Sequence, residues 1–241
     1  MEDNYTNMKK YSVFETLLWV FFLTFGLQTI LGFIAVAGIH FYGVEQNEIE
    51  RVLTQPDSIA IIGIVAALLS LPLIKKASYS SGKSFPHTFL AFQPIKKHTL
   101  FKVLLIGIIY YIFEFSVTSA LSIKTPEFLL EVKSLTNSPF DVFMLIIGVC
   151  IVAPIIEEIV FRGLAYARLE NSRVGISGAI IITSIIFTII HTQYEPSLLI
   201  IFSLFSFLLG YVRYKTGNIL YCIVLHMQLN IFSTLHLFFF L

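Results

Sequence analysis

The sequence predicts an all-α protein, a polytopic bundle of about seven membrane-spanning helices. Of its 241 residues, 56% are hydrophobic and only 13% are charged, and the mean hydropathy is +0.84. These values are far more apolar than a soluble domain requires. A helix needs roughly 20 mainly apolar residues to cross a hydrocarbon core of about 30 Å, and seven runs approach that length. They lie near residues 13–42, 58–74, 103–122, 141–161, 175–192, 197–212 and 219–240.

The first run, 13–42, is too long for one straight span and too short for two. We count it once, and an eighth span is the alternative. Each run is apolar around its whole circumference, unlike a surface helix of a soluble protein. Among the loops, 123–140 is expected to contain a short helix lying on the membrane, because Phe128, Leu129 and Val132 would share one face.

The distribution of lysine and arginine predicts the orientation in the membrane. If Lys9 and Lys10 face the cytoplasm, twelve basic residues lie in loops on that side, Arg168 and Arg213 among them. Only Arg51, Lys124 and Lys133 lie on the other. Such an excess marks the cytoplasmic side, so we expect the N-terminus inside and, in a bacterium, an inner or plasma membrane location. The first span has no small-residue cleavage site and is expected to stay uncleaved. A net charge of +1 without a basic, aromatic-rich cluster gives no support for a nucleic-acid partner.

Ionisable side chains gather in the C-terminal half, where a bilayer makes each one cost about 2.5–3.5 kcal/mol near its centre. Glu158 and Arg162 are four residues apart with the acid first, the favourable order for a helical ion pair, so Arg162 is expected to hold Glu158. Glu157 lies about 100° further around the helix and is left to face a cavity as a base. The other deep polar residues are His191, His226 and Asn230.

Two further pairs use the same four-residue spacing, which places side chains on one helix face. Phe187 precedes His191, and His226 precedes Asn230. Any one of these pairs could simply hold helices together. Their coincidence within half of a very apolar chain favours hydrolytic chemistry. Glu114, inside the third run, is unexplained and is predicted to support the site from outside.

These residues resemble the motifs of the CAAX protease and bacteriocin-processing family of intramembrane endopeptidases. Glu-Glu-x-x-x-Arg begins at Glu157, Phe-x-x-x-His at Phe187 and His-x-x-x-Asn at His226, in the family's order. The resemblance covers roughly residues 141–235. It divides the one membrane domain into N-terminal helices and loops, 1–140, and a catalytic core, 141–241.

The resemblance implies hydrolysis of a peptide bond in a membrane-associated protein or peptide. Glu157 and His191 would activate water, His226 and Asn230 would stabilise the oxyanion, and Glu158 and Arg162 would support the site, with Phe187 beside them. No cofactor is certain. Zinc or another divalent metal could be held by Glu157, His191 and His226, although no His-Glu-x-x-His helix is present. The substrate is left open between a prenylated C-terminus, a pheromone leader and a bacteriocin precursor.

Straight spans would put Glu157 near the cytoplasmic end of its helix and His191 near the outer end of the next. The two can meet only if the fourth helix extends beyond the bilayer, kinks at Pro154, or is followed by a helix that starts in the cytosol. The competing functions are an inactive scaffold or bacteriocin-immunity protein of the same fold, a rhomboid-type serine protease using Ser177 with His226, and, last, a transporter.

Overall fold

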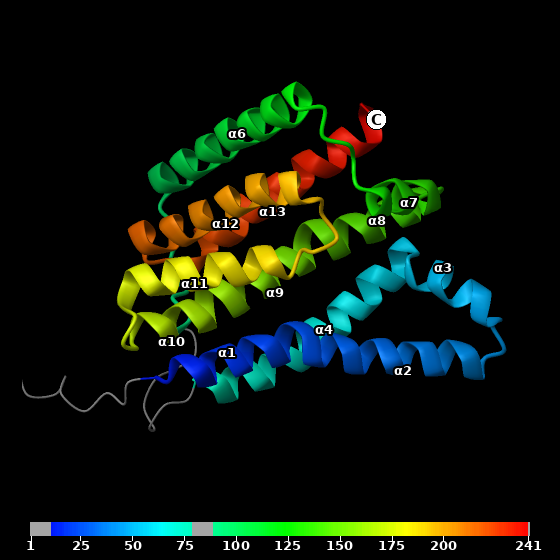
Figure 1. Cartoon of the computed structure of the whole chain (residues 1–241), viewed down its shortest axis with the longest axis horizontal. Coiled ribbons are helices and arrows are strands. Elements are labelled where there is room, and N and C mark those ends of the chain that lie inside the picture. Colours follow the sequence, from blue (N-terminus) through cyan, green and yellow to red (C-terminus); the bar gives the residue numbers. More distant parts are fainter. Residues whose placement is uncertain (1–10, 79–88, 241) are drawn as a thin grey trace, which may run out of the picture.

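The computed structural model describes residues 11–78 and 89–240, and within those ranges every regular element is a helix. The predicted all-α, multi-pass membrane fold is confirmed, because all seven apolar runs appear as helices packed in one bundle (Figure 1). Six of them are long and apolar enough to cross a bilayer, and Gly175–Ile189 is a shorter apolar helix. The six are Val13–Phe41, Pro56–Ser78, Lys97–Ala120, Pro139–Glu170, Pro196–Thr216 and Ile219–Phe239.

The N-terminal part consists of two spans joined by two short connecting elements. The first run is a single helix, which supports counting it as one span; its parts are α1 (Val13–Phe21), the π-helical η1 (Phe22–Gly26) and α2 (Leu27–Phe41). The chain then returns through η2 (Gln46–Glu48), α3 (Ile49–Leu53) and α4 (Pro56–Ser78).

The third span, α6 (Lys97–Ala120), is followed by the short helix predicted in the loop, α7 (Glu127–Leu135). Phe128, Leu129 and Val132 on one face of α7 are half-buried, whereas Glu127 and Glu131 are exposed, as their spacing predicted. Residues 79–88 of the earlier loop, including Lys83, lie outside the described part of the chain, as do Lys9 and Lys10.

The fourth run is one helix of 32 residues, Pro139–Glu170. At 1.5 Å per residue it is about 48 Å long, well beyond a hydrocarbon core of about 30 Å. Its parts are α8 (Pro139–Leu145), η3 (Ile146–Val152), α9 (Ala153–Glu158), η4 (Ile159–Ala165) and α10 (Tyr166–Glu170), of which η3 and η4 are π-helical. The carboxylates Glu157 and Glu158 therefore end a short α-helical stretch between two π-helical ones, an arrangement frequent at functional sites.

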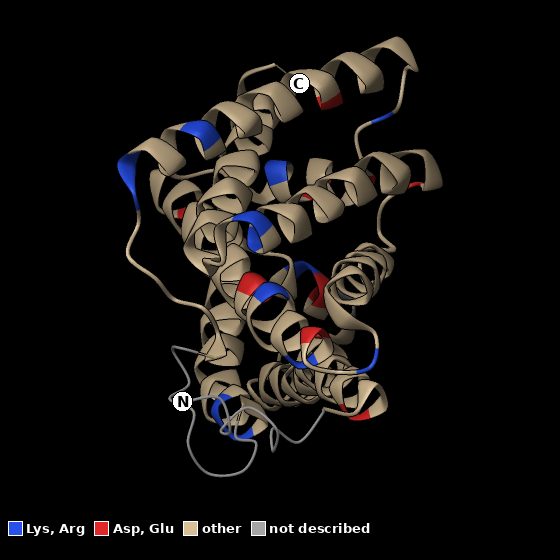
Figure 2. Ribbon diagram, turned by 90° about the vertical axis from the view of Figure 1, so that its left-hand side faces the viewer, with Lys and Arg blue, Asp and Glu red and all other residues tan. Residues whose placement is uncertain are grey.

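Three further helices pack against the long fourth helix and complete the core: α11 (Gly175–Ile189), α12 (Pro196–Thr216) and α13 (Ile219–Phe239). A left-handed Gly217 ends α12, and the Asn218 side chain accepts from the Leu220 N–H to begin α13, so the two helices turn back sharply. In sequence order α11 packs on α10 and α12, α12 on α13, and α13 on α6. Figure 2 shows few charged residues along the helices drawn.

Candidate active site

The long fourth helix resolves the depth conflict between Glu157 and His191. The helix turns back after Glu170 and the chain returns as α11, which begins at Gly175. Glu157 lies 13 residues before the end of α10, and His191 lies 16 residues after the start of α11. Both are therefore about 20–24 Å from the same turn. The fourth helix is long enough for the first of the three predicted solutions, extension beyond the bilayer.

Arg162 and Glu158 form the ion pair that their spacing predicted, with Arg162 Nη1 3.2 Å from Glu158 Oε1 and both side chains fully buried. Arg162 Nη2 also donates to the carbonyl and the hydroxyl oxygen of Ser206, each at 2.8 Å. Its guanidinium lies 4.5 Å from the centre of the Phe187 ring. Arg162 thus ties α9 to α11 and α12 while it fixes Glu158.

Glu158 in turn orients His226 from α13. Nδ1 of the buried His226 lies 2.9 Å from Glu158 Oε1, and because an ionised carboxylate only accepts hydrogen bonds, Nδ1 carries the proton. The other ring nitrogen, Nε2, lies 3.8 Å from Glu157 Oε2. His226 therefore stands between the two carboxylates, with one nitrogen fixed and the other directed at Glu157.

Glu157 and His191 line one cavity of about 300 Å³, bordered also by residues of the first two spans such as Thr24 and Ser70. The Glu157 side chain is 28% exposed, unlike its fully buried neighbour Glu158. His191 Nδ1 lies 2.7 Å from the Phe187 carbonyl, which can only accept, so in the neutral ring Nε2 carries the free lone pair. A carboxylate and a basic imidazole nitrogen thus belong to the same cavity.

Phe187 holds the aromatic parts of the site together. Its fully buried ring lies 4.8 Å from the His191 ring and 5.7 Å from the His226 ring, centre to centre, and it stacks on Phe202. Together with the Arg162 guanidinium, these contacts set the positions of both imidazoles.

Asn230 lies away from this cavity, and its Nδ2 donates to the Val149 carbonyl at 2.8 Å. That carbonyl belongs to the π-helical η3, where the Ala153 N–H bonds to Gly148. The residue five positions after Val149 is Pro154, which has no N–H to offer. Asn230 therefore replaces a backbone donor that proline removes, and its predicted role as an oxyanion donor stays a prediction.

The predicted zinc ligands can be compared with the donor positions in the site. Both imidazoles have Nδ1 engaged and Nε2 open, a pattern also found in metal-binding histidines. In residues 11–78 and 89–240, however, no three His, Cys, Asp or Glu side chains come close enough together to hold a metal ion. The present geometry of Glu157, His191 and His226 does not form a metal site.

Ser177 is poorly placed to act as a nucleophile. It is exposed in the first turn of α11, ten residues before Phe187, which contacts His226. Ten helical residues span about 15 Å. The serine-protease alternative therefore has no support from this arrangement.

Three polar side chains that fix the site or the fourth helix were not identified from the sequence, because each acts on a residue far away in the chain. Ser206 accepts from Arg162, and the buried Arg213 donates through Nε to the Arg162 carbonyl at 2.9 Å. Arg168, counted among the loop cations, is buried and pairs with Glu15 at 2.8 Å. It also donates to the Ala77 carbonyl. These two arginines fix helix ends instead of lying in open loops.

Comparison with known proteins finds a family match for the segment of the chain that contains the site residues. Residues 139–232 match the family described as type II CAAX prenyl endopeptidase Rce1-like. The resemblance predicted from the motifs is confirmed over this segment. The chain is also 29% identical over 83 residues to UPF0177 protein YxdF of Lactococcus lactis subsp. lactis (strain IL1403). That alignment covers 34% of this chain and 44% of YxdF, so the chain spans less than half the length of this curated relative. No solved structure matches the chain.

Proposed function

We propose that this protein is an intramembrane endopeptidase that hydrolyses a peptide bond in a membrane-associated protein or peptide. The observation that carries the proposal is the cavity shared by Glu157 and His191, beside a His226 ring fixed by Glu158. The Rce1-like match over 139–232 includes all three motifs and supports the same class of reaction.

In the proposed mechanism Glu157 takes one proton from a water molecule whose other hydrogen is bound by Nε2 of His191, and the water oxygen attacks the peptide carbonyl. Glu157 then gives that proton to the amine that leaves as the C–N bond breaks. Negative charge then develops on the carbonyl oxygen, and a hydrogen-bond donor placed there is worth a few kcal/mol. His226 can donate from Nε2 only when both ring nitrogens are protonated. Glu158, 2.9 Å from Nδ1, stabilises that imidazolium. Asn230 joins as a second donor if its bond to Val149 is exchanged for one to the substrate.

The proposal uses water activated by glutamate and histidine, without a tightly bound metal. Metal content measured on the purified, active protein tests this part. Activity with less than about 0.1 metal ion per chain would support it. Retention of one zinc per chain, with activity lost on chelation and restored by zinc, would contradict it.

The alternative function is a scaffold or immunity protein that keeps the fold without turnover. A deletion strain complemented with Glu157→Gln separates the two, because binding should survive loss of the base. The exposed Glu127→Gln on α7 is the matched control. An enzyme predicts that Glu157→Gln fails to complement although the protein accumulates normally, and a scaffold predicts full complementation.

The substrate is to be found by comparing membrane peptides from cells that carry the wild type or Glu157→Gln. A precursor that accumulates only with the variant, and whose product begins at a new terminus, is the expected result. Ser177→Ala is expected to process it normally. Within this proposal the N-terminus faces the cytoplasm, so reporter fusions in the loops 42–55 and 190–195 should both report the side opposite to the cytoplasm. A cytoplasmic signal from both loops would reverse the orientation.

A further inference from the structure

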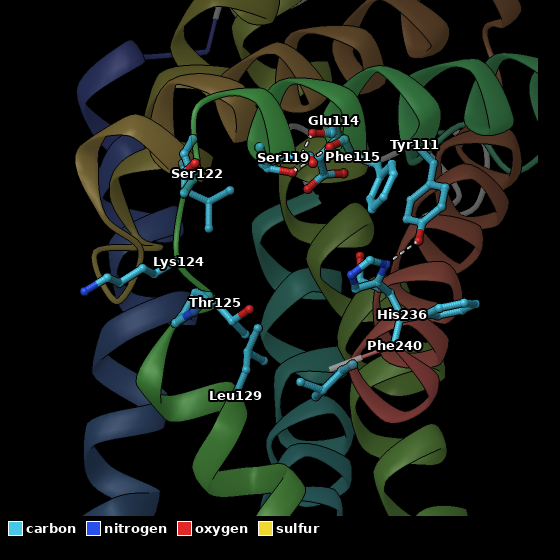
Figure 3. A pocket seen from close by; sticks show the side chains of 16 residues that line it. Tyr111, Glu114, Phe115, Ser119, Ser122, Lys124, Thr125, Leu129, His236 and Phe240 are labelled. Carbon is cyan, nitrogen blue, oxygen red and sulfur yellow. Dashed lines mark hydrogen bonds between the residues drawn. The ribbon is translucent and has the colours of Figure 1, made fainter.

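A second cavity, larger than the one at Glu157, lies between α6, α7 and the C-terminal half of α13 (Figure 3). Its volume is about 700 Å³. Its wall is mostly apolar, formed by side chains such as Phe115, Leu129, Leu237 and Phe240, and the acid on it is Glu114. Glu157 and His191 do not line this cavity, so it is distinct from the proposed catalytic cavity.

Glu114 is the buried polar group in this cavity that lacks a partner for one of its carboxylate oxygens. Its Oε2 atom is buried and makes no hydrogen bond, and within the described residues Glu114 forms no ion pair. Lys124 also lines the cavity, but it is exposed and its ammonium points away from Glu114 in Figure 3. A carboxylate held in apolar surroundings without a partner is costly, and a cation that enters the cavity would relieve that cost.

A second polar position faces the same cavity. The Tyr111 hydroxyl lies 3.2 Å from His236 Nδ1, and both side chains are on the wall shown in Figure 3. The cavity thus combines one unpaired acid, the Tyr111–His236 pair, several serine and threonine side chains and a mainly apolar surface. That combination suits an amine or guanidinium carried on an apolar chain.

The helix α13 runs from the catalytic site, where His226 approaches Glu157, to the wall of the second cavity. Ser233 on the second cavity's wall is seven residues after His226, two helical turns and about 10 Å along the same face. His236 is ten residues after His226, or about 15 Å. An extended peptide covers about 15 Å with four to five residues.

Tyr194 lies in the connection from α11 to α12. Its ring stacks on His191, with centres 6.0 Å apart, and contacts Phe128 of α7. Burial raises the pKa of Tyr194 to about 12, and the charges of Glu114 and Glu157 add to that rise. Tyr194 thus contacts His191 of the catalytic cavity and also α7, whose Leu129 lines the second cavity.

We propose that the cavity at Glu114 is a second binding site, and that its ligand is a cationic group carried on an apolar chain. Resting on the protease function proposed above, this group is a basic side chain or amine of the substrate, held four to five residues from the bond that is cut. Glu114 would then determine specificity without touching the reacting atoms.

The cavity is tested first without any turnover, using the detergent-purified full chain and hexylamine, with 1-hexanol as the uncharged probe of equal length. We expect hexylamine to raise the thermal midpoint of the wild type more than 1-hexanol does. Glu114→Gln should weaken the apparent affinity for hexylamine at least about tenfold, which corresponds to 1.4 kcal/mol. Glu131→Gln, exposed on α7, should leave it unchanged, and Glu114→Asp should keep most of it.

Each other outcome overturns the inference. Equal hexylamine effects in the wild type and Glu114→Gln, or none in the wild type, would refute a cation site at Glu114. If the hexylamine effect disappears in Glu157→Gln but not in Glu114→Gln, the amine binds in the catalytic cavity instead. Because binding needs no hydrolysis, a chain that binds hexylamine through Glu114 but cleaves nothing would refute the protease function and leave this site standing.

The link to the substrate is tested once a cleaved peptide is known. Replacing its basic residue four to five positions from the cut should lower kcat/KM about tenfold in the wild type and have little further effect in Glu114→Gln. Equal losses in both proteins would show that the residue does not meet Glu114.

Discussion

Arg162→Met is expected to be among the most destabilising single substitutions in this chain. It removes an ion pair of 3.2 Å to Glu158, two hydrogen bonds of 2.8 Å to Ser206, and the contact with the Phe187 ring. It also leaves the Glu158 carboxylate, which has no exposed surface, with His226 as its remaining partner. Removing one partner of a buried ion pair typically costs about 3–5 kcal/mol, and we expect a loss in that range.

The assay is equilibrium unfolding of the purified protein by sodium dodecyl sulfate in mixed micelles. Arg51→Met is the matched control, because it removes an exposed pair to Glu48 at 3.7 Å, worth no more than about 1 kcal/mol. The double variant Glu158→Gln with Arg162→Met should be less destabilised than Arg162→Met alone, since no buried charge is left unpaired. If Arg162→Met loses no more free energy of unfolding than Arg51→Met, the reasoning about this pair is wrong.

Two further predictions concern the π-helical η3. Asn230→Ala leaves the Val149 carbonyl unpaired and should lower the free energy of unfolding by about 1–3 kcal/mol. This loss should be smaller in a Pro154→Ala background, because alanine restores a backbone N–H. An equal loss in that background would contradict the proposed origin of the hydrogen bond. Gly148→Ala would bring a Cβ within 3.0 Å of the backbone of α4 and should cost about 1–3 kcal/mol, measured by the same unfolding assay. Gly32→Ala, with open space around its Cβ, is the control, and equal stability of the two variants would show that α4 and η3 are not closely packed.

Hydropathy and local spacing predicted the helices and the Glu158–Arg162 pair, because both depend on neighbours within one helix. The short α7 was also predictable, since its half-buried face follows from a helical period. The same reasoning could not reveal η3 and η4, whose wider turns depend on packing against other helices. A kink at Pro154 was one of three alternatives for the fourth helix. The helix continues past Pro154, and Asn230 donates to the Val149 carbonyl that the proline leaves without a backbone donor.

Partners that come from distant parts of the chain were also beyond a sequence argument. Arg168 and Arg213 follow apolar runs, so they were counted as loop cations. The structure buries both, one against Glu15 and the other on the Arg162 carbonyl. The count of positive charges therefore includes residues whose position is set by pairing inside the bundle, and the orientation needs its own experiment.

The central claim is that Glu157 acts as the base of a peptide hydrolase. The most direct measurement is the rate at which the chain, reconstituted in lipid vesicles, cuts the precursor identified in cells. Loss of a general base typically lowers a rate about 10²- to 10⁴-fold, and we expect Glu157→Gln to fall in that range while Glu127→Gln keeps the wild-type rate. A Glu157→Gln protein that cuts the precursor as fast as the wild type would contradict the account.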